Sequence, residues 1–298
     1  MTTRSVVARP GRLDSVVAEA LALPRADVQR AIAEGRVLVE GRPRLKSFRL
    51  GGGETVEVSL AGPGDLEPDP RPLRVIYRDA DLAVVSKPAG VITHPTASHR
   101  TGTVVNRLLG MGIPLAPSEA PDRPGIVHRL DVGTSGLMVV ASSPEGLAGL
   151  QEIFRTHRAE RRYLALVRGF PSHDDFLVEA PLERHRARIR VGRVMGREAA
   201  TEVRVRDRLA EATLVEATPR TGRTHQIRVH LSAVGHPILG DRAYGGGGDD
   251  AKRLGLSRPF LHSWRIAFDH PISGERIEVE DPLPDDLAEA LNRARAGR

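Results

Sequence analysis

The sequence contains no cysteine, which excludes disulfide bonds, a thiol nucleophile and metal sites built from thiolates. Aromatic residues make up only 3% of the chain, and lysine occurs three times, so almost all of the 44 basic residues are arginines. No apolar run approaches the roughly 18 residues that a membrane-spanning helix needs, and the N-terminus lacks the apolar segment of a signal peptide. These absences predict a soluble, cytoplasmic protein.

What the chain has in excess is positive charge. Its formal net charge is +6, which suits a polyanionic partner such as a nucleic acid. Arginine forms paired hydrogen bonds with phosphate groups and stacks on bases. The abundance of arginine, alanine and glycine also indicates a GC-rich coding bias, which is a second explanation of the basic character. The basic character therefore favours RNA as a partner without identifying it.

The length of 298 residues allows one small and one medium domain, and we expect both. Residues 1–60 show two short helical patterns followed by strand-like runs, which predicts a small α/β domain. Residues 61–72 are rich in proline and glycine and have no apolar periodicity, so we expect a semi-rigid linker there. Residues 73–298 would form the larger domain.

Patterns in the larger part predict an α+β fold with a mixed, largely antiparallel sheet flanked by helices. Short strand-like runs occur at 75–77 and 82–85, and residues 184–208 alternate between arginine and apolar positions, as in antiparallel strands with one basic face. Helical spacing of apolar residues occurs at 145–158 and again at 225–235.

The most informative stretch is GIVHRLDVGTSGLMVVA, from Gly125 to Ala141, which reads as strand, turn and buried strand. It places the single carboxylate of Asp131 on the turn, where it is either a reactive group or a turn residue that accepts hydrogen bonds from backbone N–H groups. A hydrolase triad of His128, Asp131 and Ser135 is disfavoured because three neighbours on one loop rarely converge. The nucleophile-elbow pattern fails because Leu137 replaces its second glycine.

The string HRLDVGTSGL closely resembles the HRLD-x-x-TSGL signature of the RluA-type family of pseudouridine synthases, whose aspartate attacks the target uridine. RRYLALVRG resembles the strand of that family that supplies a tyrosine, and TPRTGRTHQIRVHLSAVGHPILGD resembles the segment whose arginine pairs with the aspartate. The resemblance implies that Asp131 is the nucleophile, that Tyr163 stacks on the flipped base and that Arg228 pairs with Asp131. From its pattern alone, Tyr163 would be an ordinary core residue.

Other matched positions are candidates for contact with RNA. LAVVSKPAG resembles a further family segment, in which Lys87 lies either near bound RNA or in solvent beside a turn. Arg129 is next to the nucleophile and is a candidate to fill the gap that a flipped uridine leaves. The RNA-binding candidates in this part of the chain are Lys87, His128, Arg129, Thr134, Arg223 and His225.

RLDSVVAEALALPRADVQRAIAEGRVLVEGR, near the N-terminus, resembles the small RNA-binding domain first described in the fourth protein of the ribosomal small subunit. In that domain the second helix and the following turn face RNA. The resemblance makes four arginines candidate phosphate contacts, and a solvated arginine face is an equally good explanation of any one of them. These residues are Arg25, Arg30, Arg36 and Arg42.

Taken together, the motifs predict a pseudouridine synthase that acts on structured RNA. Large-subunit ribosomal RNA is favoured because family members with this accessory domain often act there, and transfer RNA is the alternative substrate. A non-catalytic RNA-binding or ribosome-assembly protein that kept the fold is the alternative class. We expect a monomer without a membrane association, a cofactor or a metal, since the reaction involves no redox change and His225 and His230 lack a carboxylate partner at ligand spacing.

Overall fold

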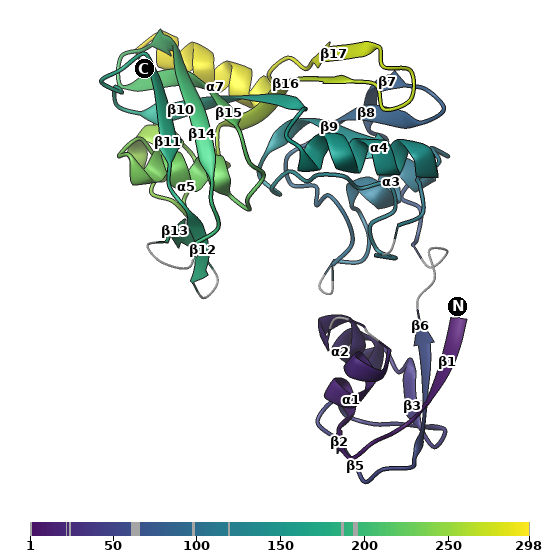
Figure 1. Cartoon of the computed structure of the whole chain (residues 1–298). Coiled ribbons are helices and arrows are strands. Elements are labelled where there is room, and N and C mark those ends of the chain that lie inside the picture. Colours follow the sequence, from purple (N-terminus) through teal and green to yellow (C-terminus); the bar gives the residue numbers. More distant parts are fainter. Residues whose placement is uncertain are drawn as a thin grey trace.

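The structure is a computed structural model, and nearly all of the chain is described in it. Its strands form a four-stranded sheet near the N-terminus, a nine-stranded sheet in the remainder and two short two-stranded pairs among the described residues (Figure 1). No helix in these parts of the chain is both long and apolar enough to cross a membrane. The described residues are 2–21, 23, 25–60, 66–96, 99–118, 120–185, 188–192 and 196–297.

The N-terminal unit consists of two helices packed on a small antiparallel sheet, as predicted. The helices are α1 (Leu13–Ala20) and α2 (Arg25–Ala33), and their apolar faces share one buried cluster with the strands. One strand was not predicted, because TTRSVV lacks a turn signal or a run of apolar residues. The sheet has the order β1 (Thr2–Val7), β6 (Thr55–Leu60), β3 (Val37–Val39), β4 (Arg42–Pro43), and β2 (Gly11–Arg12) pairs with β5 (Arg49–Leu50).

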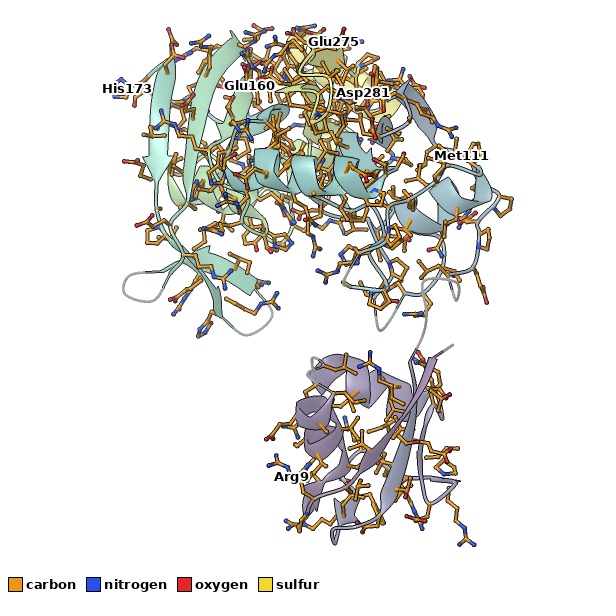
Figure 2. All side chains as sticks on the ribbon, turned by 45° about the vertical axis from the view of Figure 1, so that its right-hand side comes forward. Arg9, Met111, Glu160, His173, Glu275 and Asp281 are labelled. Atoms are coloured by element: carbon orange, nitrogen blue, oxygen red, sulfur yellow. The ribbon has the colours of Figure 1, made fainter. Side chains whose placement is uncertain are left out.

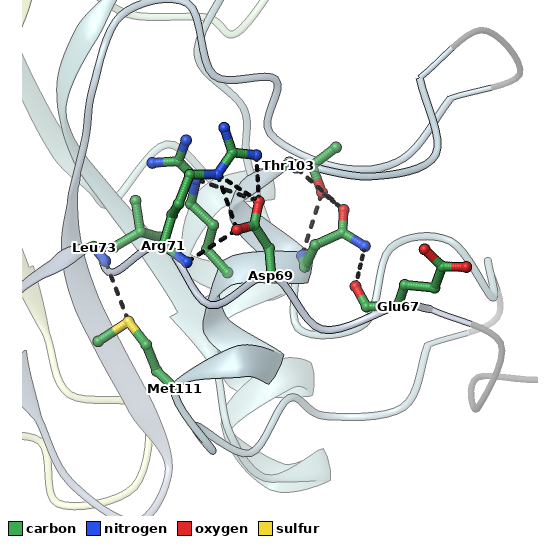
Figure 3. A network of polar contacts seen from close by, with 8 residues as sticks. Glu67, Asp69, Arg71, Leu73, Thr103 and Met111 are labelled. Atoms are coloured by element: carbon green, nitrogen blue, oxygen red, sulfur yellow. Dashed lines mark hydrogen bonds and ion pairs between the residues drawn. The ribbon is translucent and has the colours of Figure 1, made fainter.

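Part of the predicted linker is packed on the larger unit. Residues 61–65 lie outside the described residues, and residues 66–72 form no helix or strand. Asp69 is buried beside α3 (Val104–Gly110), where it accepts two hydrogen bonds from the guanidinium of Arg71, and the carbonyl oxygen of Glu67 accepts one from the amide of Asn106 over 2.7 Å (Figure 3). We therefore propose that residues 61–65, rather than 61–72, connect the two units.

The large sheet is mixed and largely antiparallel, which confirms the predicted fold class. Among the described strands the parallel pairing is that of β9 with β16, which joins the two halves of the sheet. β17 (Arg276–Glu280) pairs with β16, and β12 (Leu182–His185) and β13 (Arg188–Val191) form a separate hairpin. The order is β11 (Asp175–Glu179), β14 (Ala200–Arg208), β15 (Ala212–Pro219), β10 (Glu160–Arg168), β16 (Leu261–Asp269), β9 (Ser135–Ala141), β8 (Leu82–Lys87), β7 (Arg74–Arg78).

Helices cover both faces of the sheet, which explains why the strand β9 is buried along its whole length (Figure 1). In β9, Leu137 and Val139 pack towards α4 (Pro144–Arg155), whereas Met138 and Val140 pack towards α3. In the other half, α5 (Gln226–Ala233) and α7 (Asp285–Arg295) share one buried cluster with β10, β14 and β15. A short helix, α6 (Asp249–Arg253), adds to the same cluster.

One local expectation was wrong. The lead-in to Asp131 was predicted as a strand, but Ile126 makes only an isolated bridge to Val140, and the segment otherwise runs as turns and loop.

The acidic C-terminal region forms the helix α7, in which Leu287, Ala290, Leu291 and Ala294 are buried at helical spacing. Acidic residues in its first turn, Asp285 and Asp286, favour the helix through its dipole.

Gly136, at the start of β9, is required by the close approach of β16. Its φ is 110°, and a Cβ atom there would clash with the backbone carbonyl of Ser263. Replacing Gly136 with alanine should lower the free energy of unfolding by about 3 kcal/mol, because backbone strain and the clash add. Gly274→Ala is the control, since Gly274 also has a positive φ but has open space around its Cβ position, and about 1 kcal/mol is expected. Urea denaturation of both variants checks this, and equal losses would contradict it.

Candidate active site

The loop that carries Asp131 is held by hydrogen bonds to two other segments. Inside the loop, the N–H of Thr134 donates to the carbonyl oxygen of Asp131 over 3.0 Å and closes the turn. The N–H of Gly90 donates to the carbonyl oxygen of Val132 over 2.7 Å, which ties the loop to the turn after β8. His128 makes the second external connection, to β9. These contacts fix the backbone on either side of the carboxylate.

The imidazole of His128 lies between β9 and α4. Its Nε2 accepts a hydrogen bond from the backbone N–H of Val139 over 2.9 Å, and its ring stacks on Phe154 with ring centroids 4.5 Å apart. An accepting Nε2 requires the neutral imidazole. Burial, with a smaller effect of the charge of Arg161, accordingly lowers the pKa of His128 to about 3. His128 therefore holds the loop, and its predicted contact with RNA stays a prediction.

Asp131 and Arg228 are brought together from elements 97 residues apart. The Nη1 of Arg228, on α5, donates to Oδ2 of Asp131 over 3.1 Å, and both side chains are largely buried, with 11% and 16% of their surfaces exposed. The predicted proximity of the two residues is thus present in the structure. Ile227 and Leu231 are buried on the core side of α5, so Arg228 is directed towards the loop.

Arg228 has a second carboxylate partner, Asp241. Its Nε and Nη2 donate to the two oxygens of Asp241 over 2.6 and 2.9 Å, and its guanidinium carbon lies 4.9 Å from the centre of the Tyr244 ring. Burial alone would lower the pKa of Arg228, but the hydrogen bonds and charges of Asp241 and Asp131 outweigh it and raise the pKa above its usual value. Arg228 is therefore a permanent cation in this site.

His225 completes the surroundings of Asp131. Its Nε2 lies 3.8 Å from Oδ1 of Asp131, and its Nδ1 lies 2.7 Å from the hydroxyl of Tyr244. The N-cap residue of α5 is His225, which has a φ of 56° and makes no side-chain cap bond. Burial lowers the pKa of His225, so the ring is mainly neutral at pH 7.

A pocket of about 630 Å³ opens over these residues. Tyr163, from β10, lines it and is 6% exposed, and burial raises the pKa of this tyrosine, which keeps the phenol protonated at neutral pH. Among the described residues that line it, Asp131 is the only carboxylate. The arginines that line the same pocket are Arg123, Arg129, Arg155, Arg161, Arg223 and Arg228.

Most of the candidates from the sequence lie at this pocket. Asp131, Tyr163 and Arg228 line it together, as do the RNA-binding candidates His128, Arg129, Thr134, Arg223 and His225. Arg129 and Arg223 are exposed, although Nε of Arg223 donates to the carbonyl oxygen of Glu198 over 3.1 Å.

Lys87 corrects the expectation that its side chain meets RNA or solvent. It is completely buried, and its Nζ donates to the carbonyl oxygens of Pro88 and Val91 over 3.0 and 2.8 Å. Burial lowers the pKa of Lys87 to about 7, against the opposing attraction of Asp131. Its hydrogen bonds hold the turn whose Gly90 supports the Asp131 loop, so this lysine acts inside the protein.

The four arginines predicted to contact RNA in the N-terminal unit differ in their surroundings. Arg36 is mostly buried and bonds to Glu34 and to the carbonyl oxygen of Ser59, which corrects the prediction that it faces a phosphate. Arg25 is half exposed but donates twice to the buried carboxylate of Asp14. Arg42 is exposed on β4, and the side chain of Arg30 lies outside the described residues.

One cluster in the described residues has the spacing of a metal site, and the prediction that the protein needs no metal stays a prediction. The cluster consists of Asp79, Asp81 and His270, whose potential ligand atoms lie within 4.8 Å of one another. Protein donors already occupy most of these atoms. The Oδ2 of Asp79 accepts from the hydroxyl of Tyr77 over 2.6 Å and lies 3.0 Å from Nε2 of His270, while its Oδ1 accepts from two backbone N–H groups. These bonds account for the cluster as a brace of the β7–β8 turn.

Comparisons with known proteins agree with this site. A family model described as RNA pseudouridylate synthase matches residues 81–233, and a model of the S4 domain matches residues 11–56. The chain belongs to the RNA pseudouridylate synthase family. The sequence-based predictions of this family and of an isomerase are thereby confirmed, and residues 11–56 are an S4 domain, a domain that binds RNA.

Relatives of this RNA pseudouridylate synthase are similar over nearly its whole length. An uncharacterized RNA pseudouridine synthase of Mycobacterium bovis is 39% identical over 94% of this chain and 93% of its own length. The ribosomal large subunit pseudouridine synthase D of Xanthomonas campestris pv. campestris is 38% identical over 95% of this chain and 89% of its own length. The structure of human RNA pseudouridylate synthase domain containing 4 is similar with a TM-score of 0.59, at 25% identity, over 74% of this chain and 93% of that one.

Sequence reasoning missed two residues of the site, Asp241 and Tyr244. Both lie in HPILGDRAYG, directly after the α5 segment, where an acid and a tyrosine three residues apart gave no separate signal of chemistry. The only indication was that Asp241 ends the matched arginine segment and that Tyr244 follows it closely. Both reach Arg228 because the turn after Ile238 folds back onto α5.

His128 should make the stability of the protein depend on pH. Its folded-state pKa lies below the value of 6.5 for a free imidazole, so the unfolded chain binds a proton between pH 6.5 and about 3 that the folded chain does not. Its contribution is therefore intact above pH 6.5 and is lost as the pH falls. At pH 5 the loss should be about 2 kcal/mol, since each pH unit is worth ~1.4 kcal/mol for one group.

His128→Gln tests this, because the glutamine oxygen can accept from the N–H of Val139 but does not titrate. Urea denaturation at pH 7.5 and pH 5 should show a smaller difference between the two pH values for the variant than for the unchanged protein. His173→Gln is the control, since His173 is exposed beside β11 (Figure 2). An unchanged pH dependence in His128→Gln would contradict the assignment.

Proposed function

We propose that this chain converts specific uridines of large-subunit ribosomal RNA into pseudouridine, with Asp131 as the nucleophile. The observation that carries the proposal is the pocket, in which one carboxylate stands among six arginines. Such a site attracts a polyanion and presents a single nucleophile to it. The proposed substrate is further supported by relatives named ribosomal large subunit pseudouridine synthase D in Xanthomonas, Neisseria and Zymomonas.

The reaction breaks the bond between C1′ and N1 of uridine and forms one between C1′ and C5. The C5 proton is lost and N1 gains a proton, so no redox partner is needed. In our proposal Asp131 attacks or deprotonates the nucleotide, and Arg228 orients its carboxylate through the 3.1 Å hydrogen bond. Tyr163, protonated and buried in the pocket wall, stacks on the base and is placed to move a proton.

The remaining residues serve the binding of RNA in this proposal. The target uridine must leave its stack, and the exposed Arg129 beside the nucleophile would occupy the space it vacates. Arg223 and the neighbouring arginines of the pocket rim contact phosphates, and Arg25 and Arg42 do so on the S4 domain. The chain is proposed to act as a monomer in the cytoplasm.

Asp131→Asn should reduce pseudouridine formation by at least about 1000-fold, because the amide removes the nucleophile while keeping its shape. Pseudouridines in ribosomal and transfer RNA are mapped in cells from which the protein has been removed and in the same cells supplied with the unchanged protein, Asp131→Asn or the control variant. Asp174→Asn is the control, since this carboxylate is 78% exposed and outside the pocket. The proposal is supported if pseudouridines of ribosomal RNA disappear in cells without the protein and return only with the unchanged or the control protein.

Other outcomes of the mapping reject parts of it. Sites that vanish from transfer RNA alone would change the substrate and keep the activity. Restoration of the sites by Asp131→Asn would reject the nucleophile. Maps that are identical in all strains would favour the RNA-binding or assembly role.

Arg42→Ala should weaken RNA binding by a few-fold and reduce the slope of log K against log salt by about 1, because one phosphate contact is lost. Binding to unmodified ribosomal RNA is measured at several salt concentrations. Arg9→Ala is the control, since Arg9 is already paired with Glu19 within the same unit. An unchanged slope in Arg42→Ala, or an equal change in both variants, would remove Arg42 from the proposed interface.

A further inference from the structure

Arg228 is shared unequally between its two carboxylates. Two of its nitrogens, Nε and Nη2, donate to Asp241 over 2.6 and 2.9 Å, and only Nη1 donates to Asp131, over a longer distance of 3.1 Å. Asp241 is also the more deeply buried acid, with 1% of its side chain exposed against 16% for Asp131. Most of the binding capacity of the guanidinium is therefore directed away from the nucleophile.

The turn that carries Asp241 is rigid. The N–H of Asp241 donates to the carbonyl oxygen of Ile238 over 3.1 Å, and its own carbonyl oxygen accepts from the N–H of Gly246 over 2.8 Å. Gly246 packs so closely that a Cβ atom would clash with the backbone of Ile238. Oδ1 of Asp241 also accepts from the N–H of Ala243 over 3.1 Å, which fixes the direction of the carboxylate.

The same turn places Tyr244 against the other side of the site. Its ring lies under the guanidinium of Arg228, and its hydroxyl lies 2.7 Å from Nδ1 of His225 and accepts from the N–H of Ile189 over 3.3 Å. With that N–H donated to it, the hydroxyl can give its own hydrogen to Nδ1, and we assign the tautomer of His225 with the proton on Nε2. Nε2 is the nitrogen that faces Asp131.

Neither Asp241 nor Tyr244 is among the residues that line the pocket, whereas Arg228, His225 and Asp131 are. The direct contacts that connect this acid and this tyrosine with the pocket residues are those with Arg228 and His225. Fixing a long arginine side chain costs conformational entropy. The two hydrogen bonds to Asp241 and the ring of Tyr244 fix Arg228 before the substrate binds, so this cost does not fall on the reaction.

We propose that Asp241 and Tyr244 are positioning residues that lock Arg228 and His225 into the orientation needed at Asp131. The inference rests on the proposed function and deepens it. Asp241 takes two of the guanidinium nitrogens, so the nucleophile is oriented by a single hydrogen bond from Nη1 of Arg228.

The test is a double-mutant cycle on the full-length enzyme. Asp241→Asn keeps the shape but loses the charge and half of the fork, and it should lower the single-turnover rate about 100-fold, as expected for small misplacement of a catalytic partner. The affinity for RNA should change less than about threefold, because Asp241 lies outside the pocket. The assay follows tritium release from uridine labelled at C5 in total RNA from cells that lack the protein.

Arg228→Lys and the double variant complete the cycle. If Asp241 acts through Arg228, Asp241→Asn combined with Arg228→Lys should be no slower than Arg228→Lys alone. Losses that multiply would show that Asp241 acts independently of Arg228 and would overturn the inference. A rate for Asp241→Asn within threefold of the unchanged enzyme would overturn it as well.

Asp69→Asn is the matched control, since Asp69 is a buried carboxylate held by two donors of Arg71 but far in the chain from the pocket residues (Figure 3). It should lower the melting temperature and leave the rate of the folded enzyme unchanged. If Asp241→Asn does not fold, Tyr244→Leu takes its place in the cycle, because it removes the ring beneath Arg228 and keeps Asp241. Its rate loss should be about tenfold and smaller in the Arg228→Lys background, where only the part that acts through His225 remains.

The failures of the two proposals are distinct. If the unchanged enzyme releases no tritium from this RNA, the proposed function is rejected. If the unchanged enzyme is active and Asp131→Asn is inactive, but the cycle shows independent losses, only the positioning role is rejected.

Discussion

The buried contact between Asp131 and Arg228 is the constraint on which the rest of the site depends. Removing two charges from water costs several kcal/mol for each ion, and a single 3.1 Å hydrogen bond repays little of this. The structure offsets the cost by surrounding Arg228 with a second carboxylate and an aromatic ring. The arginine is thus stabilised mainly by Asp241 and Tyr244, and Asp131 is left with capacity for chemistry.

That contact also explains the arrangement of the large sheet around it. Asp131 lies on the loop that leads into β9, whereas Arg228 lies on α5, which packs on β10, β14 and β15. The two halves of the sheet meet at the parallel pairing of β9 with β16, where Gly136 lets the backbones approach. Helices on both faces bury the pairing of β9 with β16. The packing of the core therefore sets the distance between the Asp131 loop and α5.

The sequence was sufficient for the parts of the fold and site that follow local rules. The unbroken apolar run of β9 predicted a strand buried on both faces, and the helical spacing of Ile227 and Leu231 correctly directed Arg228 away from the core. It was insufficient where the environment is set by distant segments. Lys87 reads as a solvated residue because lysine is rarely buried, and only the fold shows the carbonyl oxygens of Pro88 and Val91 closing around it.

Arginine content illustrates the same limit. The S4 domain has several arginines in the helix and turn that the family resemblance indicated. Arg36 is mostly buried and bonds to Glu34, so its charge is largely balanced inside the unit, whereas the half-exposed Arg25 shares the carboxylate of Asp14 with Arg12. The pocket differs because one carboxylate lines it beside six arginines, of which Arg228 also bonds to Asp241 and Arg155 to Glu152. A net charge of +6 spread over 298 residues says little about either place. What attracts a polyanion is a local excess of unbalanced cations, and that depends on which acids the fold brings beside each arginine.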